Sequence, residues 1–193
     1  MLTAGEIAVQ IGRGELAWPG ELRGDGLLLR LGSPLQPLVP RNSQVIDLAE
    51  QDSIDTLYEQ PVHGCGDFEL TPGRMALCVV EQPLRLGATL AAAIGTLSHL
   101  ARVGLATHVT SPWVMPGWDG HITLELLNVG PATLRLRQGM PVARAVIWRM
   151  DGATREAVPH PHYGRNGQGS EEEIRSLLDR LLPPAGEGGT GGR

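Results

Sequence analysis

Turn-forming residues interrupt the apolar segments of this chain at short intervals. The 193 residues include 26 Gly and 15 Pro. Apolar runs separated by such turns at intervals of about 8–12 residues are typical of a β-sandwich or β-barrel. Aromatic residues make up only 4% of the chain and include a single Phe, so aliphatic side chains must fill the core of this mainly β protein.

The pattern of apolar residues and turns predicts a series of short strands. They are expected at residues 27–31, 45–48, 67–70, 75–81, 105–110, 121–128, 133–137 and 142–149. The run at 75–81 is continuous enough to be buried on both faces of a sheet. The Pro-rich segment 33–45 is expected to cross the surface without regular structure.

Helices are predicted at residues 3–13, 88–103 and 170–182. Thr3 and Glu6 have the spacing of a capping box at the first of them. Ser170 caps the last one, and the Gly-rich remainder of the chain is expected to be disordered. We therefore expect a barrel domain over residues 1–169, followed by a C-terminal helix and tail over residues 170–193.

Charge and cysteine content narrow the range of functions. The net charge of −5 argues against a nucleic-acid partner, and the absence of Lys excludes a Schiff-base lysine. Cys65 and Cys78 form no CxxC motif, which excludes a disulfide framework and a Cys-rich zinc site. Neither a signal-peptide pattern nor an apolar stretch of about 18 residues is present, so we expect a cytoplasmic protein with no membrane partner.

Four short motifs follow one another in the middle of the chain and end at Asn128. They read SHLARVGL (98–105), HVT (108–110), PGWDG (116–120) and TLEL (123–126). Their order and spacing resemble the central block of dCTP deaminases, which reads roughly RSSLARLGL, HVTA, DPGWxG and LEFYN. Flanking echoes of the same family are LRLG (29–32), LTPG (70–73), RQGM (137–140) and Tyr163 with GQG (167–169).

This resemblance implies the fold and assembly of the dUTPase/dCTP deaminase superfamily. The family fold is a distorted, jelly-roll-like β-barrel with short helices. Three chains assemble around a threefold axis, with active sites between neighbours, so the resemblance implies a homotrimer.

The resemblance also implies a catalytic carboxylate at Glu125. In the family, a Glu activates the water that attacks C4 of cytosine and relays a proton to the departing ammonia, without a catalytic metal. The zinc-deaminase signature H-x-E…P-C-x-x-C is missing from this chain. On an apolar strand Glu125 would be partly desolvated, which would raise its pKa toward that of a general base. A solvated Glu at a sheet edge is the alternative interpretation.

Further site residues are implied by the same comparison. Ser98 and Arg102 match positions that hold phosphate and the active-site water or base, and residues four apart share one helix face. A helix cap and a surface ion pair are the alternative interpretation of these two residues. Gln168 matches a residue that helps close the site. His160 and His162 form an HxH pair that lacks a third ligand, so we expect no metal site there.

Several positions depart from the family pattern, and most change a charged residue to an apolar or aromatic one. The family has Arg at Leu97 and Trp113, Ser at His99, Asp at Leu28 and Met115, and Lys near His162. A triphosphate needs paired donors, whereas these residues suit an apolar ligand or serve as core replacements. The substrate-binding candidates are Leu97, His99, Ser111, Trp113, Met115, Thr123, Leu124, Tyr163 and Gln168.

Three functions remain open from the sequence. The first is deamination of dCTP or a related cytosine nucleotide, with Mg²⁺ present only if the substrate is a triphosphate. The second is a repurposed enzyme, for example a cyclase in natural-product biosynthesis. It would bind an apolar small molecule between subunits, shape it with Trp113 and use Glu125 as acid or base. The third is a non-catalytic regulatory or binding barrel.

Overall fold

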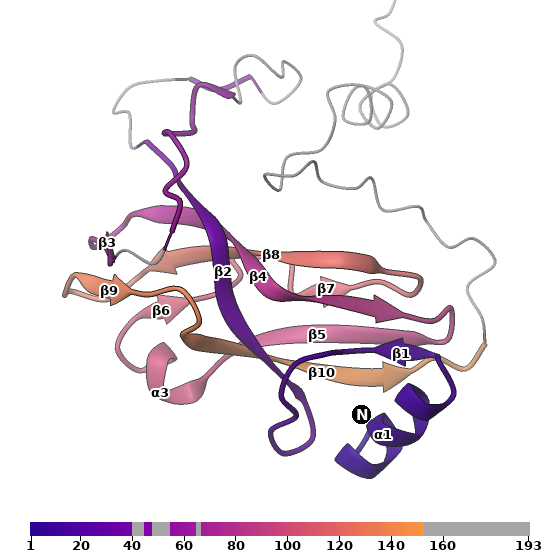
Figure 1. The fold of residues 1–193 in the computed structure, drawn as a ribbon. Helices are drawn as coiled ribbons and strands as arrows, with labels where there is room; N and C mark the ends of the chain where they lie inside the picture. Colours follow the sequence, from indigo (N-terminus) through magenta and orange to yellow (C-terminus); the bar gives the residue numbers. More distant parts are fainter. Residues whose placement is uncertain (40–44, 48–54, 65–66, 153–193) are drawn as a thin grey trace, which may run out of the picture.

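One curled antiparallel sheet wraps around the core of the protein (Figure 1). The structure is a computed structural model that describes residues 1–39, 45–47, 55–64 and 67–152. In spatial order the sheet contains β6 (Leu105–Ala106), β8 (Asp119–Asn128), β4 (Met75–Leu86), β2 (Leu27–Pro37), β10 (Pro141–Arg149), β5 (Leu90–Thr96) and β7 (Trp113–Val114). The remaining elements are β1 (Leu16–Ala17), which pairs with β4, the two-stranded ribbon of β3 (Phe68–Leu70) and β9 (Leu134–Leu136), and helices α1 (Ala4–Gly12) and α3 (Ser98–Ala101).

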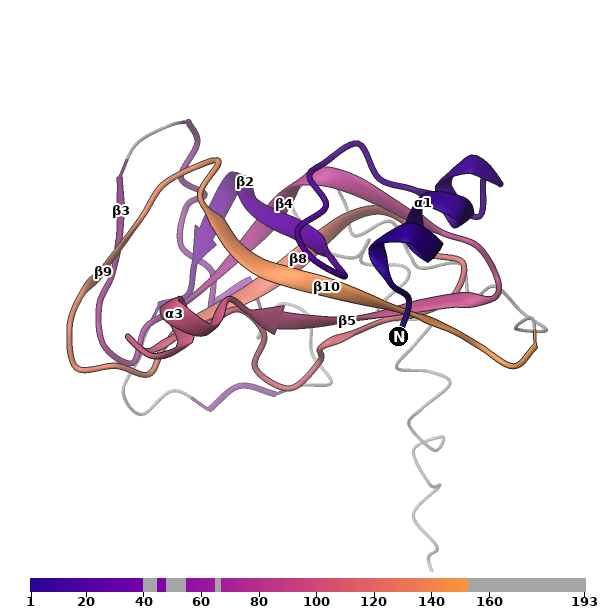
Figure 2. The same ribbon diagram turned by 90° about the horizontal axis from the view of Figure 1, so that it is seen from below.

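The sheet forms a half-barrel with an open seam. Figures 1 and 2 both place β5 and β10 on one side of the core and β4 and β8 on the other. In the described part of the chain, no ladder joins β7 back to β8. The predicted mainly β, jelly-roll-like architecture with short helices is therefore confirmed, with one side of the barrel left open in a single chain.

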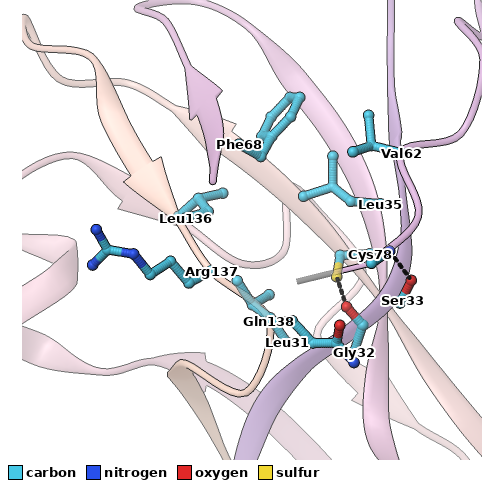
Figure 3. A pocket seen from close by; sticks show the side chains of 11 residues that line it. Leu31, Gly32, Ser33, Leu35, Val62, Phe68, Cys78, Leu136, Arg137 and Gln138 are labelled. Atoms are coloured by element: carbon cyan, nitrogen blue, oxygen red, sulfur yellow. Dashed lines mark hydrogen bonds between the residues drawn. The ribbon is translucent and has the colours of Figure 1, made fainter. Parts of the chain in front are cut away.

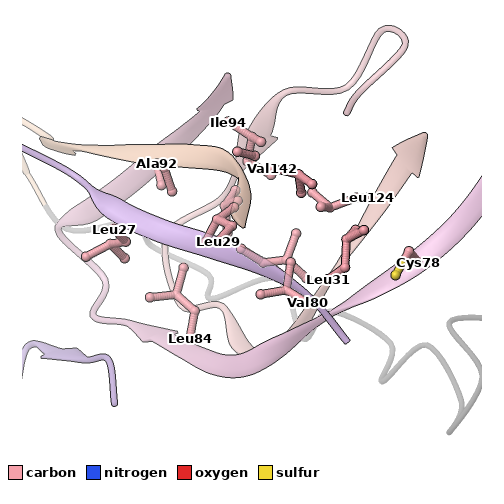
Figure 4. Close-up of a cluster of buried hydrophobic side chains, with 14 of the residues drawn as sticks. Leu27, Leu29, Leu31, Cys78, Val80, Leu84, Ala92, Ile94, Leu124 and Val142 are labelled. Atoms are coloured by element: carbon pink, nitrogen blue, oxygen red, sulfur yellow. The ribbon is translucent and has the colours of Figure 1, made fainter. Parts of the chain in front are cut away.

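Mostly aliphatic side chains from strands throughout the fold fill the core, as the composition predicts (Figure 4). Alternate residues of each strand point inward, because successive side chains of a strand lie on opposite faces. Burying one such Leu or Ile stabilises the fold by roughly 1.5–3 kcal/mol relative to leaving it exposed. Representative members of this cluster are Leu27, Leu29 and Leu31 of β2, Val80 of β4, Ala92 and Ile94 of β5, Leu124 of β8 and Val142 of β10.

The first helix forms as predicted. Thr3 is the N-cap of α1, and its Oγ1 accepts a hydrogen bond from the Glu6 amide. The Glu6 carboxylate in turn accepts one from the Thr3 amide at 2.8 Å, which completes the capping box. The predicted strands at 67–70, 75–81, 121–128, 133–137 and 142–149 are also confirmed, with small changes at their ends.

The helix predicted at 88–103 is wrong. This segment contains strand β5 and only a four-residue helix, α3. Burial alternates along β5, with Leu90, Ala92 and Ile94 inside. The ladder to β10 pairs every residue from Leu90 to Thr96, and this tertiary pairing outweighs the helical propensity of three consecutive alanines.

The segment after residue 31 also differs from the prediction. Strand β2 continues to Pro37, across a register shift between Leu31 and Leu35. This shift accommodates Pro34, which has no amide hydrogen to donate.

Two other predicted strands are absent or shorter than expected. Residues 45–47 are not a strand, and Val45 is 90% exposed. Only Leu105–Ala106 of the strand expected at 105–110 is extended.

The prediction that residues 75–81 are buried on both faces of the sheet is also wrong. Strand β4 alternates, so that Ala76, Cys78 and Val80 face the core while Met75 and Leu77 lie half-buried on the other face.

The C-terminal predictions lie outside the described residues. These include the helix at 170–182, the tail, and the domain boundary between residues 169 and 170. Within the residues that the structure describes, no helix has the length and apolar character needed to span a membrane.

The connection from α3 to β6 contains a residue, Gly104, whose position we predict to tolerate only glycine. Gly104 has a φ of 96°, and a Cβ on it would collide with the backbone of Gly130. We expect Gly104→Ala to lower the free energy of unfolding by more than the roughly 1–2 kcal/mol of left-handed strain alone. Gly73→Ala is the matched control, because Gly73 has a φ of 74° and open space around its Cβ position. Urea unfolding curves of both variants measure the difference, and equal losses would contradict the predicted collision.

Candidate active site

A cavity of about 410 Å³ lies beside strands β4, β5, β7 and β8. Its lining is mostly apolar, with a few polar groups, as is usual for sites that bind small molecules. Residues from segments outside these four strands complete the wall of the cavity. The lining residues are Leu38, Tyr58, Met75, Leu77, Ile94, Ser111, Trp113, Val114, Trp118, Ile122, Thr123 and Glu125.

Among the described residues that line this cavity, Glu125 is the only one that carries a formal charge. The alternation of β8 places Thr123 and Glu125 on one face of the sheet, opposite the buried Leu124 and Leu126. Those two leucines therefore face the core and do not surround the carboxylate. Its apolar neighbour across the ladder is Leu77, which pairs directly with Glu125. The Glu125 side chain is thus half-buried in a cavity rather than surrounded by open solvent.

One oxygen of the Glu125 carboxylate has a fixed partner. The Val109 amide donates a hydrogen bond of 2.8 Å to Oε2. For Oε1, the described residues provide no hydrogen-bond partner. The carboxylate is therefore oriented by the main chain while its second oxygen can accept a proton or a hydrogen bond from a molecule in the cavity.

Aromatic side chains border the cavity near β7. Trp113 is 62% exposed and its ring lies 6.0 Å from that of Trp148, with an interplanar angle of 48°. The Trp118 indole lies deeper and donates its Nε1 hydrogen to the Gly120 carbonyl at 3.1 Å. Met115, also a sequence candidate, is 50% exposed and does not line the cavity.

The candidates on α3 lie apart from the cavity of their own chain. Ser98, His99 and Arg102 are exposed, and Leu97 is the buried N-cap residue of the helix. None of them lines the Glu125 cavity. Figure 1 shows α3 beside β6 and the β9 connection, away from β7. A single chain therefore does not bring Ser98 and Arg102 to Glu125.

The other sequence candidates fall into three groups. Ser111 and Thr123 line the cavity, whereas Leu124 is 1% exposed and belongs to the core. Tyr163, Gln168, His160 and His162 lie outside the described residues. Across the described ranges, no three His, Cys, Asp or Glu side chains come together in a way that could hold a metal ion.

Sequence reasoning missed eight of the described lining residues: Leu38, Tyr58, Met75, Leu77, Ile94, Val114, Trp118 and Ile122. Reading the run at 75–81 as alternating would have placed Met75 and Leu77 on one face. Leu38 follows β2 within the Pro-rich stretch. Tyr58 lies in a segment without any recognisable motif, and only the folded chain brings it to the cavity.

A second hollow, beside β2 and β4, is too small for a ligand (Figure 3). Its volume of about 20 Å³ has room for roughly one water molecule. Cys78 lies at its base, where the thiol faces the Gly32 carbonyl at 3.8 Å. Burial raises the pKa of this thiol to about 12, so it is protonated and unreactive at neutral pH.

The sequence of this chain matches a known protein family. The family model described as dCTP deaminase-like matches residues 1–150. The chain belongs to the dCTP deaminase-like family. The motif block at 98–128 that suggested this relationship supplies α3, the Val109 amide and the Glu125 strand.

Individual members of the dCTP deaminase-like family show the same relationship. A Rhodospirillum rubrum protein named dCTP deaminase is 38% identical over 120 residues, which cover 59% of this chain and 62% of the relative. This alignment spans less than two thirds of the relative's length. A Nocardioides protein named dCTP deaminase, dUMP-forming, is 31% identical over 173 residues, or 88% of this chain and 90% of the relative.

A solved structure supports the fold. The crystal structure of 2′-deoxycytidine 5′-triphosphate deaminase from Agrobacterium tumefaciens aligns with a TM-score of 0.58 and 21% sequence identity. The alignment covers 77% of this chain and 48% of the other. At this identity the likeness concerns the fold of the dCTP deaminase-like chain and not its activity.

The burial of Cys78 predicts slow alkylation. In a Cys65→Ser background, we expect iodoacetamide at pH 8 to modify Cys78 about 100-fold more slowly in the native protein than in urea. Because the pKa is about 12, the thiolate fraction of the native thiol still rises about tenfold per pH unit between pH 8 and 10, whereas an ordinary thiol of pKa about 8.5 is already partly ionised and gains only a few-fold in rate. Mass spectrometry of timed samples measures both rates. Rapid alkylation of the native protein would show that the thiol is accessible.

Proposed function

We propose that this protein deaminates a cytosine nucleotide by hydrolysis, with Glu125 as general base and general acid. Membership of the dCTP deaminase-like family supports the reaction class. The observation that carries the proposal is the position of Glu125, which in the described part of the chain is the only formally charged residue lining a largely apolar cavity.

The reaction follows from the contacts of this carboxylate. Oε1 removes a proton from water as the water oxygen attacks C4 of the cytosine ring. The attack opens the C4–N3 double bond and gives a tetrahedral carbon. It collapses when Glu125 returns the proton to the amino group, which leaves as ammonia, while the proton of the new hydroxyl passes to N3, so that a uracil carbonyl remains. The Val109 amide holds Oε2 through both steps. This proton transfer requires no metal, and Mg²⁺ would enter only as a counterion of a triphosphate substrate.

The assembly is part of the proposal. No basic residue is found among the described residues that line the cavity, although a bound triphosphate needs paired donors. Ser98 and Arg102 are exposed on α3, away from the cavity of their own chain. We propose a homotrimer in which α3 of one chain approaches the cavity of its neighbour. Ser98 and Arg102 would then position the phosphates and the water.

A second candidate function is supported by the apolar character of the lining. Trp113, Leu77 and Ile94 suit an uncharged ligand better than a phosphorylated one. In this alternative the protein is a repurposed enzyme, such as a cyclase, that binds an apolar molecule and uses Glu125 as acid or base.

Ammonia release from dCTP tests the proposed reaction. We expect the wild-type protein to release ammonia and Glu125→Gln to lose about 10²–10⁴-fold of the rate, because the amide cannot accept the proton. Glu81→Gln is the control, since Glu81 is exposed on β4 outside the cavity and should retain full activity.

Two results would contradict the proposal. One is wild-type protein without ammonia release, and the other is unchanged release by Glu125→Gln. If apolar ligands raise the melting temperature while dCTP does not, the second candidate function replaces the first.

Mixing two inactive variants tests the trimer. We expect a mass of three times the 20.6 kDa chain by light scattering. Glu125→Gln and Arg102→Gln, unfolded together and refolded, should regain about one quarter of wild-type activity, because random mixing restores that share of sites between neighbours. Each variant refolded alone is the control. A monomer, or a mixture that remains inactive, would show that the sites do not lie between chains.

A further inference from the structure

A short segment, residues 55–64, lies along the far end of strand β2, and we call it the strap. Its backbone is held by antiparallel hydrogen bonds. The Val39 amide donates to the Leu57 carbonyl at 2.8 Å, and the Glu59 amide donates to the Pro37 carbonyl at 3.0 Å. Farther along, Leu35 and Val62 exchange two such bonds of 3.1 and 2.7 Å. The strap is therefore fixed to the sheet at both ends.

The Arg74 side chain joins the strap to the strands that carry the site. Its Nη2 donates to the Leu38 carbonyl at 2.9 Å and to the Glu59 carboxylate at 2.7 Å. The two charged side chains are only 30% and 39% exposed. On the other side, the Arg74 carbonyl accepts a hydrogen bond of 3.1 Å from the amide of Asn128, the last residue of β8. One residue thus connects the strap to the strand of Glu125.

This attachment brings Tyr58 to the wall of the cavity that Glu125 also lines. Tyr58 pairs with Leu38 in an isolated bridge, and both residues line the cavity. Burial, with a smaller contribution from the negative charge of Asp55, raises the pKa of the half-buried Tyr58 phenol. The hydroxyl therefore keeps its proton at neutral and mildly alkaline pH and can donate a hydrogen bond.

We infer that Tyr58 contacts the ligand of this cavity and contributes to its specificity, and that the Arg74–Glu59 pair positions it. The described lining has few polar side chains besides Glu125. Each of them therefore contributes strongly to the orientation of a bound ligand. A protonated phenol suits a planar ring that carries a carbonyl acceptor, while Glu125 suits an amino group. The ligand class is therefore an aminated, carbonyl-bearing ring. This inference rests on the proposed function for its assay substrate.

The direct test compares Tyr58→Phe, which retains the ring and removes the hydroxyl, with the wild-type protein. We expect Kd and KM for dCTP to rise about 5-fold or more, as for loss of one hydrogen bond, with kcat changed less than about 2-fold. Tyr58→Ala should raise them further. Calorimetry with dCTP and with 2′-deoxycytidine gives the Kd values when Glu125→Gln is added to both proteins to prevent turnover, and both probes should respond, because the contact is to the ring.

The positioning role has its own test. Arg74→Gln and Glu59→Gln should each raise KM while leaving kcat nearly unchanged. The double variant Tyr58→Phe/Arg74→Gln should bind no more weakly than Tyr58→Phe, because both changes remove the same contact. Arg135→Gln and Glu69→Gln are matched controls, since they break an exposed ion pair of 2.9 Å on the β3–β9 ribbon and should leave KM unaltered.

Each outcome separates this inference from the proposed function. Binding of the probes without ammonia release rejects the function, while the Kd of Tyr58→Phe still tests the tyrosine. Normal turnover with unchanged Kd in Tyr58→Phe rejects the inference alone. Fully additive effects of Tyr58→Phe and Arg74→Gln reject the positioning role. Failure of the wild-type protein to bind either probe rejects both proposals.

Discussion

The ladder between β4 and β8 determines which side chains meet the cavity and which fill the core. Because side chains alternate along a strand, a slip of one residue would exchange the two faces. In the observed register, Leu77 lies opposite Glu125, while Cys78 and Leu124 are paired one position away and face the core. The same packing that buries Leu124 and Leu126 therefore presents Thr123 and Glu125 to the cavity. Stability and site geometry depend on one register.

The charge of the cavity follows from this arrangement. The described residues of a single chain contribute one carboxylate to a lining that is otherwise apolar, aromatic or neutral. Any anionic part of a ligand must then be neutralised by groups outside this lining. The exposed guanidinium of Arg102 on α3 is one such group, although it lies apart from the cavity of its own chain. The electrostatic requirement and the open side of the half-barrel thus lead to the same proposal, an assembly of several chains.

Much of the fold could be predicted from the sequence, because turn residues and alternating strands are local signals. The capping box of α1 and strands such as β8 and β10 required only short-range patterns. The helix predicted at 88–103 failed because three consecutive alanines favour a helix locally, whereas the ladder to β10 is made by residues about fifty positions away.

The candidate site was predictable only in part. Glu125, Ser111, Trp113 and Thr123 were found through motif likeness, and all four line the cavity. Tyr58 and Leu38 were not, because their place depends on the pairing of the strap with β2. The departures from the family pattern at Leu97 and Leu28 are both buried, which favours a packing role for these two side chains.

Most of the tryptophan side chains of this chain lie at or beside the cavity. Of its four tryptophans, Trp113 and Trp118 line the cavity and Trp148 lies against Trp113. Trp18 is buried elsewhere, with its Nε1 hydrogen donated to the Glu21 carbonyl. Three of the four indole fluorophores of the folded protein therefore lie at the rim and wall of one hollow. Occupancy of that hollow can be followed optically, without attaching a label.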